Sequence, residues 1–266
     1  MAANGDGFSE VSMEDLMGQV EKRQISTIVF IIAMQKEAQL MINRFRLVKD
    51  INSPFPKEVT WVLFNGMYKD LNISIVCPGK DSTLGVDSVG TVPASLVTYA
   101  SIVAMKPDLI INAGTAGGFK AKGASIADVY IVSSVAFHDR RIPVPGLDLY
   151  GVGMRKAFPT PNLIKDLNLK VGRLSTGDSM DMPPHDKESI TANDATVKDM
   201  EGAAVVYVAD IFKVPTILLK GVTDIVDGNR PTSEEFLENL AAVTAKLDES
   251  VAKVIDFING KCLSDL

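Results

Sequence analysis

Apolar runs and helical stripes alternate along most of the chain. The first run, TIVFIIA at residues 27–33, is continuous and largely β-branched, which is typical of a strand buried on both faces. Apolar positions then recur at helical spacing, at Ala38, Met41, Ile42 and Phe45. This opening predicts a strand followed by a helix.

The same alternation continues along the chain. Apolar runs predict further strands over residues 59–65, 73–77, 109–112, 129–135, 171–176 and 216–222. A stripe between the third and fourth strands predicts a helix whose apolar face consists of Val89, Val92, Leu96, Ala100 and Val103. A second stripe predicts a helix over residues 200–211, whereas residues 143–153, rich in Pro and Gly, predict a long loop.

The last predicted element has the clearest helical pattern. Thr232 and Glu235 have the spacing of a capping box, in which the two side chains accept hydrogen bonds from backbone amides at the start of a helix. An apolar stripe runs from Phe236 to Ile258 and ends before Gly260. A long C-terminal helix is therefore predicted.

Strands alternating with helices predict the α/β class, with a central sheet covered by helices. No internal repeat or linker divides the sequence, so we expect residues 25–266 to form a single domain. Residues 1–24 carry five acidic and two basic side chains and predict a disordered acidic tail. Because ligands of α/β sheets bind beyond the carboxyl ends of the strands, candidate site residues are sought there.

Composition narrows the possible functions. The chain has 27 Lys and Arg against 33 Asp and Glu, a net charge of −6, so nucleic acid is not an expected partner. No apolar stretch approaches the ~20 residues that span a bilayer, and the acidic start does not resemble a secretory signal. We therefore expect a cytoplasmic protein without a membrane partner.

Histidine and cysteine are scarce, with two of each. Cys77 and Cys262 show no CxxC spacing, and His138 and His185 fit no metal-binding or nucleophile motif. The sequence therefore predicts no metal site. If the protein is an enzyme, its acid–base groups are expected to be carboxylates.

Three carboxylates lie just beyond predicted strands. Glu37 falls in the first turn of a helix, where the helix dipole favours the ionised form that a general base requires. Glu201 opens the helix over residues 200–211, where it could accept hydrogen bonds from a vicinal diol. Asp224 follows an apolar strand, where partial desolvation would raise its pKa and favour proton donation. Taken singly, each of them could equally be an ordinary helix-start or turn residue.

Two other segments follow strands. The glycine-rich stretch GTAGG at residues 114–118 predicts a turn whose amides can approach a ligand, but it lacks the spacing of a dinucleotide or triphosphate loop. The stretch GDSMDM at residues 177–182 predicts a polar loop. Its two methionines could contact a flat aromatic ligand or simply fill the core.

Taken together, these pieces resemble a known family. They occur in the order AMQKE at 33–37, KPDLIINAGTAGG at 106–118, TGD at 176–178, DME at 199–201 and VTD at 222–224. The ordered set resembles the plant form of the 5′-methylthioadenosine/S-adenosylhomocysteine nucleosidases, of the nucleoside phosphorylase superfamily. The resemblance runs from about Ser26 to the C-terminus.

The resemblance implies a fold and an activity. The fold would be a three-layer α/β sandwich around a mixed, partly closed sheet, in a single catalytic domain that forms a homodimer. The reaction would be hydrolysis of the N-glycosidic bond of 5′-methylthioadenosine to adenine and 5-methylthioribose, as in methionine salvage, without a metal or organic cofactor. The resemblance leaves open whether S-adenosylhomocysteine is also cleaved.

The resemblance also implies catalytic roles for two acids. Glu37 would position and deprotonate the attacking water, and Asp224 would protonate N7 of the departing adenine. Hydrolysis of a nucleoside passes through an oxocarbenium-like state, as in glycosidases. The reaction therefore suits one acid that protonates the departing adenine and a second that activates a water molecule on the opposite face of the sugar. The sequence expectation is that Glu37 starts ionised and Asp224 protonated.

The remaining residues would bind substrate. Glu201 would hold the ribose hydroxyls, with Met200 beside it, and Thr115 would lie near the ribose and purine. The other predicted substrate-binding residues are Met180 and Asp181 at the adenine, Met34 and Phe236 at the methylthio group, and Lys198 and Asp199, which precede Glu201 in the sequence. We expect the partner subunit to complete the methylthio pocket, with residues 137–139 as the candidate contribution.

Two rival functions remain open. A phosphorylase of the same superfamily would use phosphate in place of water, and phosphate sites commonly contain Arg. No Arg lies between Arg46 and Arg140, which favours the hydrolase, although Lys80 keeps the phosphorylase possible. The second rival is a binding or storage protein that has lost the chemistry. Retention of Glu37, Glu201 and Asp224 together argues against that rival.

Overall fold

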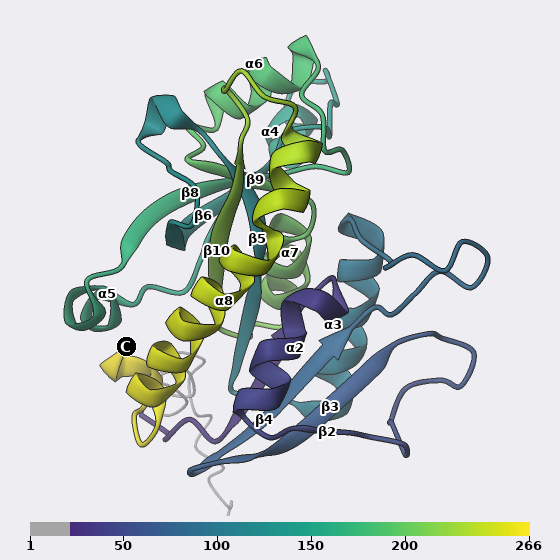
Figure 1. Cartoon of the computed structure of the whole chain (residues 1–266), viewed down its shortest axis with the longest axis vertical. Helices are drawn as coiled ribbons and strands as arrows, with labels where there is room; N and C mark the ends of the chain where they lie inside the picture. The colour runs from purple at the N-terminus through teal and green to yellow at the C-terminus, as the bar shows by residue number, and fades with distance from the viewer. Residues whose placement is uncertain (1–21) are drawn as a thin grey trace, which may run out of the picture.

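The computed structural model describes residues 22–266 and contains one mixed sheet of ten strands (Figure 1). Its centre is parallel and is formed by β4 (Leu71–Cys77), β1 (Thr27–Ile31), β5 (Leu109–Gly118) and β10 (Thr216–Ile225). Beyond β4, β3 (Val62–Tyr68) and β2 (Val48–Lys49) add antiparallel strands as an outer arm. The strands predicted from apolar runs are all present.

Five strands close into a ring. From β10 the pairing continues to β6 (Val129–Phe137), to β8 (Lys170–Thr176), to β9 (Val197–Asp199) and back to β5, which itself pairs with β10. The short β7 (Arg155–Lys156) pairs with β6 outside the ring. The predicted mixed, partly closed sheet is thus confirmed.

Helices cover both faces of the sheet. α2 (Gln35–Arg44) and α8 (Thr232–Ile258) lie side by side on the near face in Figure 1, and α3 (Thr91–Met105) and α7 (Gly202–Ile211) pack together on the other face. Alternate residues of β1 explain the three layers, because Ile28 and Phe30 join the core under α2 and α8 while Val29 and Ile31 join the core under α3 and α7. The shorter helices are α4 (Leu147–Val152), α5 (Pro161–Leu167), α6 (Pro184–Ala192), η1 (Lys120–Lys122) and η2 (Leu263–Asp265).

The buried face of α3 differs from the predicted one. Val92, Leu96 and Val103 are 65%, 54% and 52% exposed, whereas the buried side includes Val97 and Ile102. The helix is apolar on both sides, so its periodicity could not tell which side meets the sheet. The predicted stripe is therefore an exposed apolar surface.

Two local predictions are also corrected. The predicted loop over residues 143–153 contains the short helix α4. The capping box of α8 does not form, because the N-cap residue is Pro231 and the carboxylate of Glu235 instead accepts the amide of Ile225 at 2.8 Å. Glu235 thus links the start of α8 to the end of β10.

Three residues of the predicted disordered tail, 22–24, belong to the part of the chain that the structure describes. Residues 1–21 of the predicted disordered tail lie outside the described residues. Within the rest of that tail, Gln24 forms a β-bridge with Cys262 and Arg23 forms an ion pair with Asp108.

None of the helices that the structure describes combines the length and the apolar character required to cross a bilayer.

Candidate active site

A cavity of about 260 Å³ opens beside the carboxyl ends of β1, β5 and β10. All but one of the residues predicted to form the site line it. They are Met34, Glu37, Thr115, Met180, Lys198, Asp199, Met200, Glu201, Asp224 and Phe236. The sequence missed six other lining residues, which are Ala33, Val89, Ala116, Gly117, Ser179 and Thr223. Most of these are small or directly adjacent to predicted residues.

Glu37 is buried at the start of α2 and held by hydrogen bonds. Its Oε1 accepts the amide and the hydroxyl of Thr115, both at 2.7 Å, and its Oε2 accepts the amide of Met34 at 3.2 Å. Burial raises the pKa of Glu37, while the Thr115 donors, the Met34 amide and the Lys220 ammonium oppose that rise by stabilising the carboxylate. The side chain is thus a buried, oriented acceptor facing the cavity.

The glycine-rich stretch is part of a strand and not the predicted turn. β5 continues through Gly118 and pairs with β10 over nearly its whole length. A Cβ atom on Gly117 would lie 2.8 Å from Oδ2 of Asp224 and 2.5 Å from a methyl of Val226. Glycine is therefore required for close packing against Asp224, and the main chain of β5 forms one wall of the site.

Asp224 lies just after an irregularity in β10. Val222 pairs with Ala116 and Asp224 with Gly117, so Thr223 is an extra residue, a β-bulge that redirects the side chains following it. The Asp224 carboxyl is 5% exposed and accepts the hydroxyl of Thr223 at 2.8 Å. Burial raises the pKa of Asp224, and only the Thr223 hydroxyl and the more distant Lys198 oppose the rise.

Glu201 is the N-cap residue of α7, and its side chain faces the cavity. Its Oε1 accepts the amide of Gly90 at 2.8 Å. Burial and the nearby Asp199 carboxylate raise the pKa of Glu201 to about 7, while Lys220 and the Gly90 amide lower it. Both carboxylate oxygens of Asp199 already accept hydrogen bonds, Oδ1 from the Thr176 hydroxyl at 2.6 Å and Oδ2 from the Gly202 amide at 2.8 Å.

Lys220 is the principal residue that the sequence reasoning missed. It lies in β10, is 1% exposed, and forms an ion pair of 2.7 Å with Asp199. Its charge also lowers the pKa of both Glu37 and Glu201. A lysine inside the apolar run TILLKGV was the available signal, because a buried lysine requires a paired acid.

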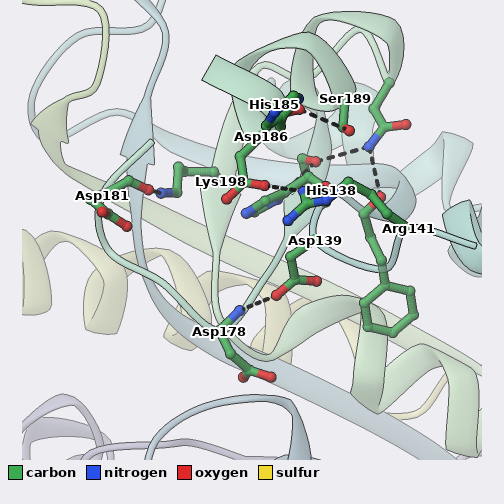
Figure 2. A network of polar contacts seen from close by, with 12 residues as sticks. His138, Asp139, Arg141, Asp178, Asp181, His185, Asp186, Ser189 and Lys198 are labelled. Carbon is green, nitrogen blue, oxygen red and sulfur yellow. Dashed lines mark hydrogen bonds and ion pairs between the residues drawn. The ribbon is translucent and has the colours of Figure 1, made fainter. Parts of the chain in front are cut away.

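Lys198 holds the loop that follows β8. Its Nζ donates to the carbonyl oxygens of Ser179, Met180 and Asp181 at 3.1, 2.9 and 2.6 Å. Asp181 is the one predicted residue outside the cavity lining. Its side chain is exposed, and its carbonyl oxygen accepts from Lys198, near which it lies in Figure 2. This loop and Met200 border one side of the cavity.

Two of the three residues expected to complete the methylthio pocket of a partner subunit are buried in the single chain. The side chains of Phe137 and His138 are 4% and 1% exposed in the single chain, and His138 Nδ1 lies 3.2 Å from the Ser175 hydroxyl. Asp139, the third residue of this candidate, is half-buried and accepts the amide of Asp178 at 2.7 Å.

No cluster of three or more His, Cys, Asp or Glu side chains suited to a metal ion occurs among residues 22–266.

Comparisons with known proteins agree with this geometry. Residues 27–256 match the family model described as the phosphorylase superfamily. A 5′-methylthioadenosine/S-adenosylhomocysteine nucleosidase of Arabidopsis thaliana is 86% identical over 254 residues, covering 96% of this chain and all of the relative. A 5′-methylthioadenosine nucleosidase of the same plant is 62% identical over the full length of both chains.

Solved structures extend the likeness to three dimensions. The crystal structure described as an MTA/SAH nucleosidase superposes with a TM-score of 0.91 at 86% identity, covering 92% of this chain and all of that one. The family match, the near-complete coverage and the shared fold lead to one conclusion. The chain belongs to the phosphorylase superfamily, in its family of 5′-methylthioadenosine/S-adenosylhomocysteine nucleosidases.

Proposed function

We propose that this protein hydrolyses the N-glycosidic bond of 5′-methylthioadenosine, releasing adenine and 5-methylthioribose. The observation that carries the proposal is the convergence of three buried or half-buried carboxyl groups, Glu37, Glu201 and Asp224, on one cavity. Their environments differ, so each can serve a different part of the reaction.

In the proposed reaction, Asp224 gives its proton to N7 of adenine while the bond between the base and the ribose breaks. Glu37 accepts a proton from a water molecule, whose oxygen forms the new bond to the sugar. The hydrogen-bonding pattern favours this division, because Glu37 receives three donors and lies near Lys220, whereas Asp224 receives one hydroxyl. The carboxylate form is thus better stabilised at Glu37 than at Asp224.

Water is favoured over phosphate as the nucleophile. Lys198, which lines the cavity, is already engaged by three carbonyl oxygens, and the fully buried Lys220 is engaged by Asp199. Lys80 does not line this cavity but another hollow with Gln35 and Asp87. A bound phosphate would therefore face carboxylates without a free cation among the described lining residues, which is electrostatically unfavourable.

The relatives support the substrate. The two Arabidopsis proteins share 5′-methylthioadenosine in their names, and the one with 86% identity is also named for S-adenosylhomocysteine. We include S-adenosylhomocysteine as a second proposed substrate of the same site. Release of 5-methylthioribose would serve methionine salvage.

We further propose that the protein works as a homodimer through the exposed face of α3. Val92, Leu96, Tyr99 and Val103 share one side of this helix and are all more than half exposed. Tyr99 also contacts the ring of Phe212, with 5.6 Å between centroids, which extends the apolar surface past the end of α7. A continuous apolar face of this kind is typical of an interface between subunits.

The experiment is an assay of the purified chain with 5′-methylthioadenosine, with and without phosphate. We expect free 5-methylthioribose and adenine in the absence of phosphate. Glu37→Gln and Asp224→Asn should fold and lose about 10²–10⁴-fold in kcat, because each removes a positioned proton transfer. S-adenosylhomocysteine is tested in parallel.

Three results would contradict the proposal. A strict requirement for phosphate, with formation of 5-methylthioribose 1-phosphate, would establish a phosphorylase. Binding of adenine without turnover would indicate a binding or storage protein. Full activity in either variant would show that the proposed acid or base is wrong.

A further inference from the structure

The start of α3 lacks a cap of its own. Its N-cap residue is Gly90, which has no side chain and has a φ of +106°. The first amides of a helix have no partner within the helix and need acceptors from elsewhere. At α3, the amides of Gly90 and Thr91 are accepted by carboxylates from two distant parts of the chain.

Asp178 provides the carboxylate for Thr91. Its Oδ1 accepts the Thr91 amide and its Oδ2 accepts the Thr91 hydroxyl, both at 2.5 Å. A Cβ atom at Gly90 would lie 2.6 Å from Oδ1 of Asp178, so glycine allows this approach. The negative charge is also favourable at the positive end of the helix dipole.

The main chain of Asp178 is fixed by a separate contact. Its amide donates to Oδ2 of Asp139 at 2.7 Å, as Figure 2 shows. The next two residues, Ser179 and Met180, line the cavity, and their carbonyl oxygens bind Lys198. Asp178 therefore joins the start of α3 to the loop on the proposed base side of the site.

The neighbouring amide, that of Gly90, contacts the residue proposed to bind the ribose. Gly90 donates to Oε1 of Glu201 at 2.8 Å, which leaves Oε2 for a ligand. We infer that Asp178 is a positioning residue: through the start of α3 it keeps the base loop and the ribose-binding Glu201 in register with one another. The inference rests on the proposed nucleosidase function.

The test compares substrate affinity with turnover. Asp178→Ala should raise KM for 5′-methylthioadenosine and the dissociation constant of adenine by about tenfold or more, since it removes two hydrogen bonds to a charged group. kcat should change by less than about threefold and its pH profile should not move, because Asp178 does not touch the reacting groups. Asp178→Asn retains one acceptor and should be intermediate.

Asp108→Ala is the matched control. Like Asp178, Asp108 accepts a backbone amide and a hydroxyl from one residue, here Ser26, and it also accepts the amide of Thr27, but it lies at the amino ends of β1 and β5, away from the cavity. We expect it to lower thermal stability without changing KM or adenine binding. If Asp178→Ala changes only stability, as this control does, or lowers kcat with KM unchanged, the inference is wrong.

A second pair of variants covers the case in which Asp178→Ala does not fold. Thr91→Val removes only the hydroxyl bond to Asp178, whereas Thr91→Ser retains it. KM and the adenine dissociation constant should rise severalfold in Thr91→Val and stay near wild type in Thr91→Ser, and equal values in the two would overturn the inference. A wild-type chain that neither cleaves the nucleoside nor binds adenine would instead overturn the proposed function, and the inference with it.

Discussion

At the scale of single residues, the site surrounds chemically similar side chains with different numbers of hydrogen-bond donors. Glu37 and Asp224 are almost equally buried, yet Glu37 accepts three hydrogen bonds and Asp224 one. Because each donor stabilises the ionised form, the base and the acid of the proposed reaction are separated by the number of donors around them. Neither the three donors nor the bulge before Asp224 was evident from the residue types.

The raised pKa of Glu201 lowers the stability of the folded protein at neutral and higher pH. Its pKa rises from 4.5 to about 7 on burial beside Asp199. An acid with a raised pKa binds more protons when folded than when unfolded, so its contribution to stability falls as pH rises from about 4.5 to about 7. Glu201→Gln should therefore raise the melting temperature above pH 7 by roughly 2–4 °C, corresponding to about 1 kcal/mol. At pH 5 the gain should be smaller.

Ionisation of Glu201 should also affect substrate binding. Substrate affinity of the wild type should fall as pH drops below about 7, because a protonated Glu201 loses acceptor capacity toward the ribose. Glu238→Gln is the comparison for stability, since Arg230 lowers the pKa of the exposed Glu238 and the variant should gain nothing at high pH. Differential scanning calorimetry at pH 5 and pH 8 measures both variants. An unchanged gap between Glu201→Gln and wild type would contradict the assignment.

At the scale of elements, the sequence predicted the strands better than the exposed faces of the helices. The apolar runs identified every long strand, and the three acids line one cavity, although Glu201 follows the short β9 and Asp224 lies within β10. The exposed side of α3 was misassigned because both of its sides are apolar. Lys220 was missed because a lysine in an apolar run acquires meaning only once its partner, Asp199, is known.

The loop after β8 depends on one ammonium group. Lys198 binds three consecutive carbonyl oxygens, so Lys198→Met leaves them without that donor in a partly buried place. We expect a loss of about 1–3 kcal/mol in stability and a weaker adenine complex, by about tenfold, because Met180 is no longer held at the cavity. Calorimetric titration with adenine measures the effect.

Lys170→Met is the control for that variant. Lys170 pairs with Asp128 at 2.6 Å at the opposite end of β8 and does not line the cavity. Its removal should leave adenine binding unchanged. Equal affinities in Lys198→Met and Lys170→Met would show that the loop does not need the Lys198 ammonium.

At the scale of the whole molecule, the exposed face of α3 bears on assembly. Leu96→Glu places a charge in the centre of the apolar face and should convert a dimer into a monomer, because an unpaired buried charge is strongly unfavourable. Sedimentation velocity distinguishes the two states. Ile51→Glu, at a side chain that is 90% exposed in the turn after β2, should remain dimeric. A monomeric wild type, or a dimeric Leu96→Glu, would contradict the proposed interface.

The closed ring of strands also determines which optical signal reports on the site. Asp224 and the wall of β5 belong to the ring, so exposing them requires that continuous pairing be broken. The chain has a single tryptophan, Trp61, which packs edge-on against Phe55 at the start of the outer arm. Trp61 also packs against the core beneath α3 and α7, to which ring residues such as Val132 and Leu174 belong, so intrinsic fluorescence reports on the outer arm together with that core. A denaturation curve recorded by tryptophan emission therefore describes the loss of that shared packing, and does not report on the pairing around Asp224 alone.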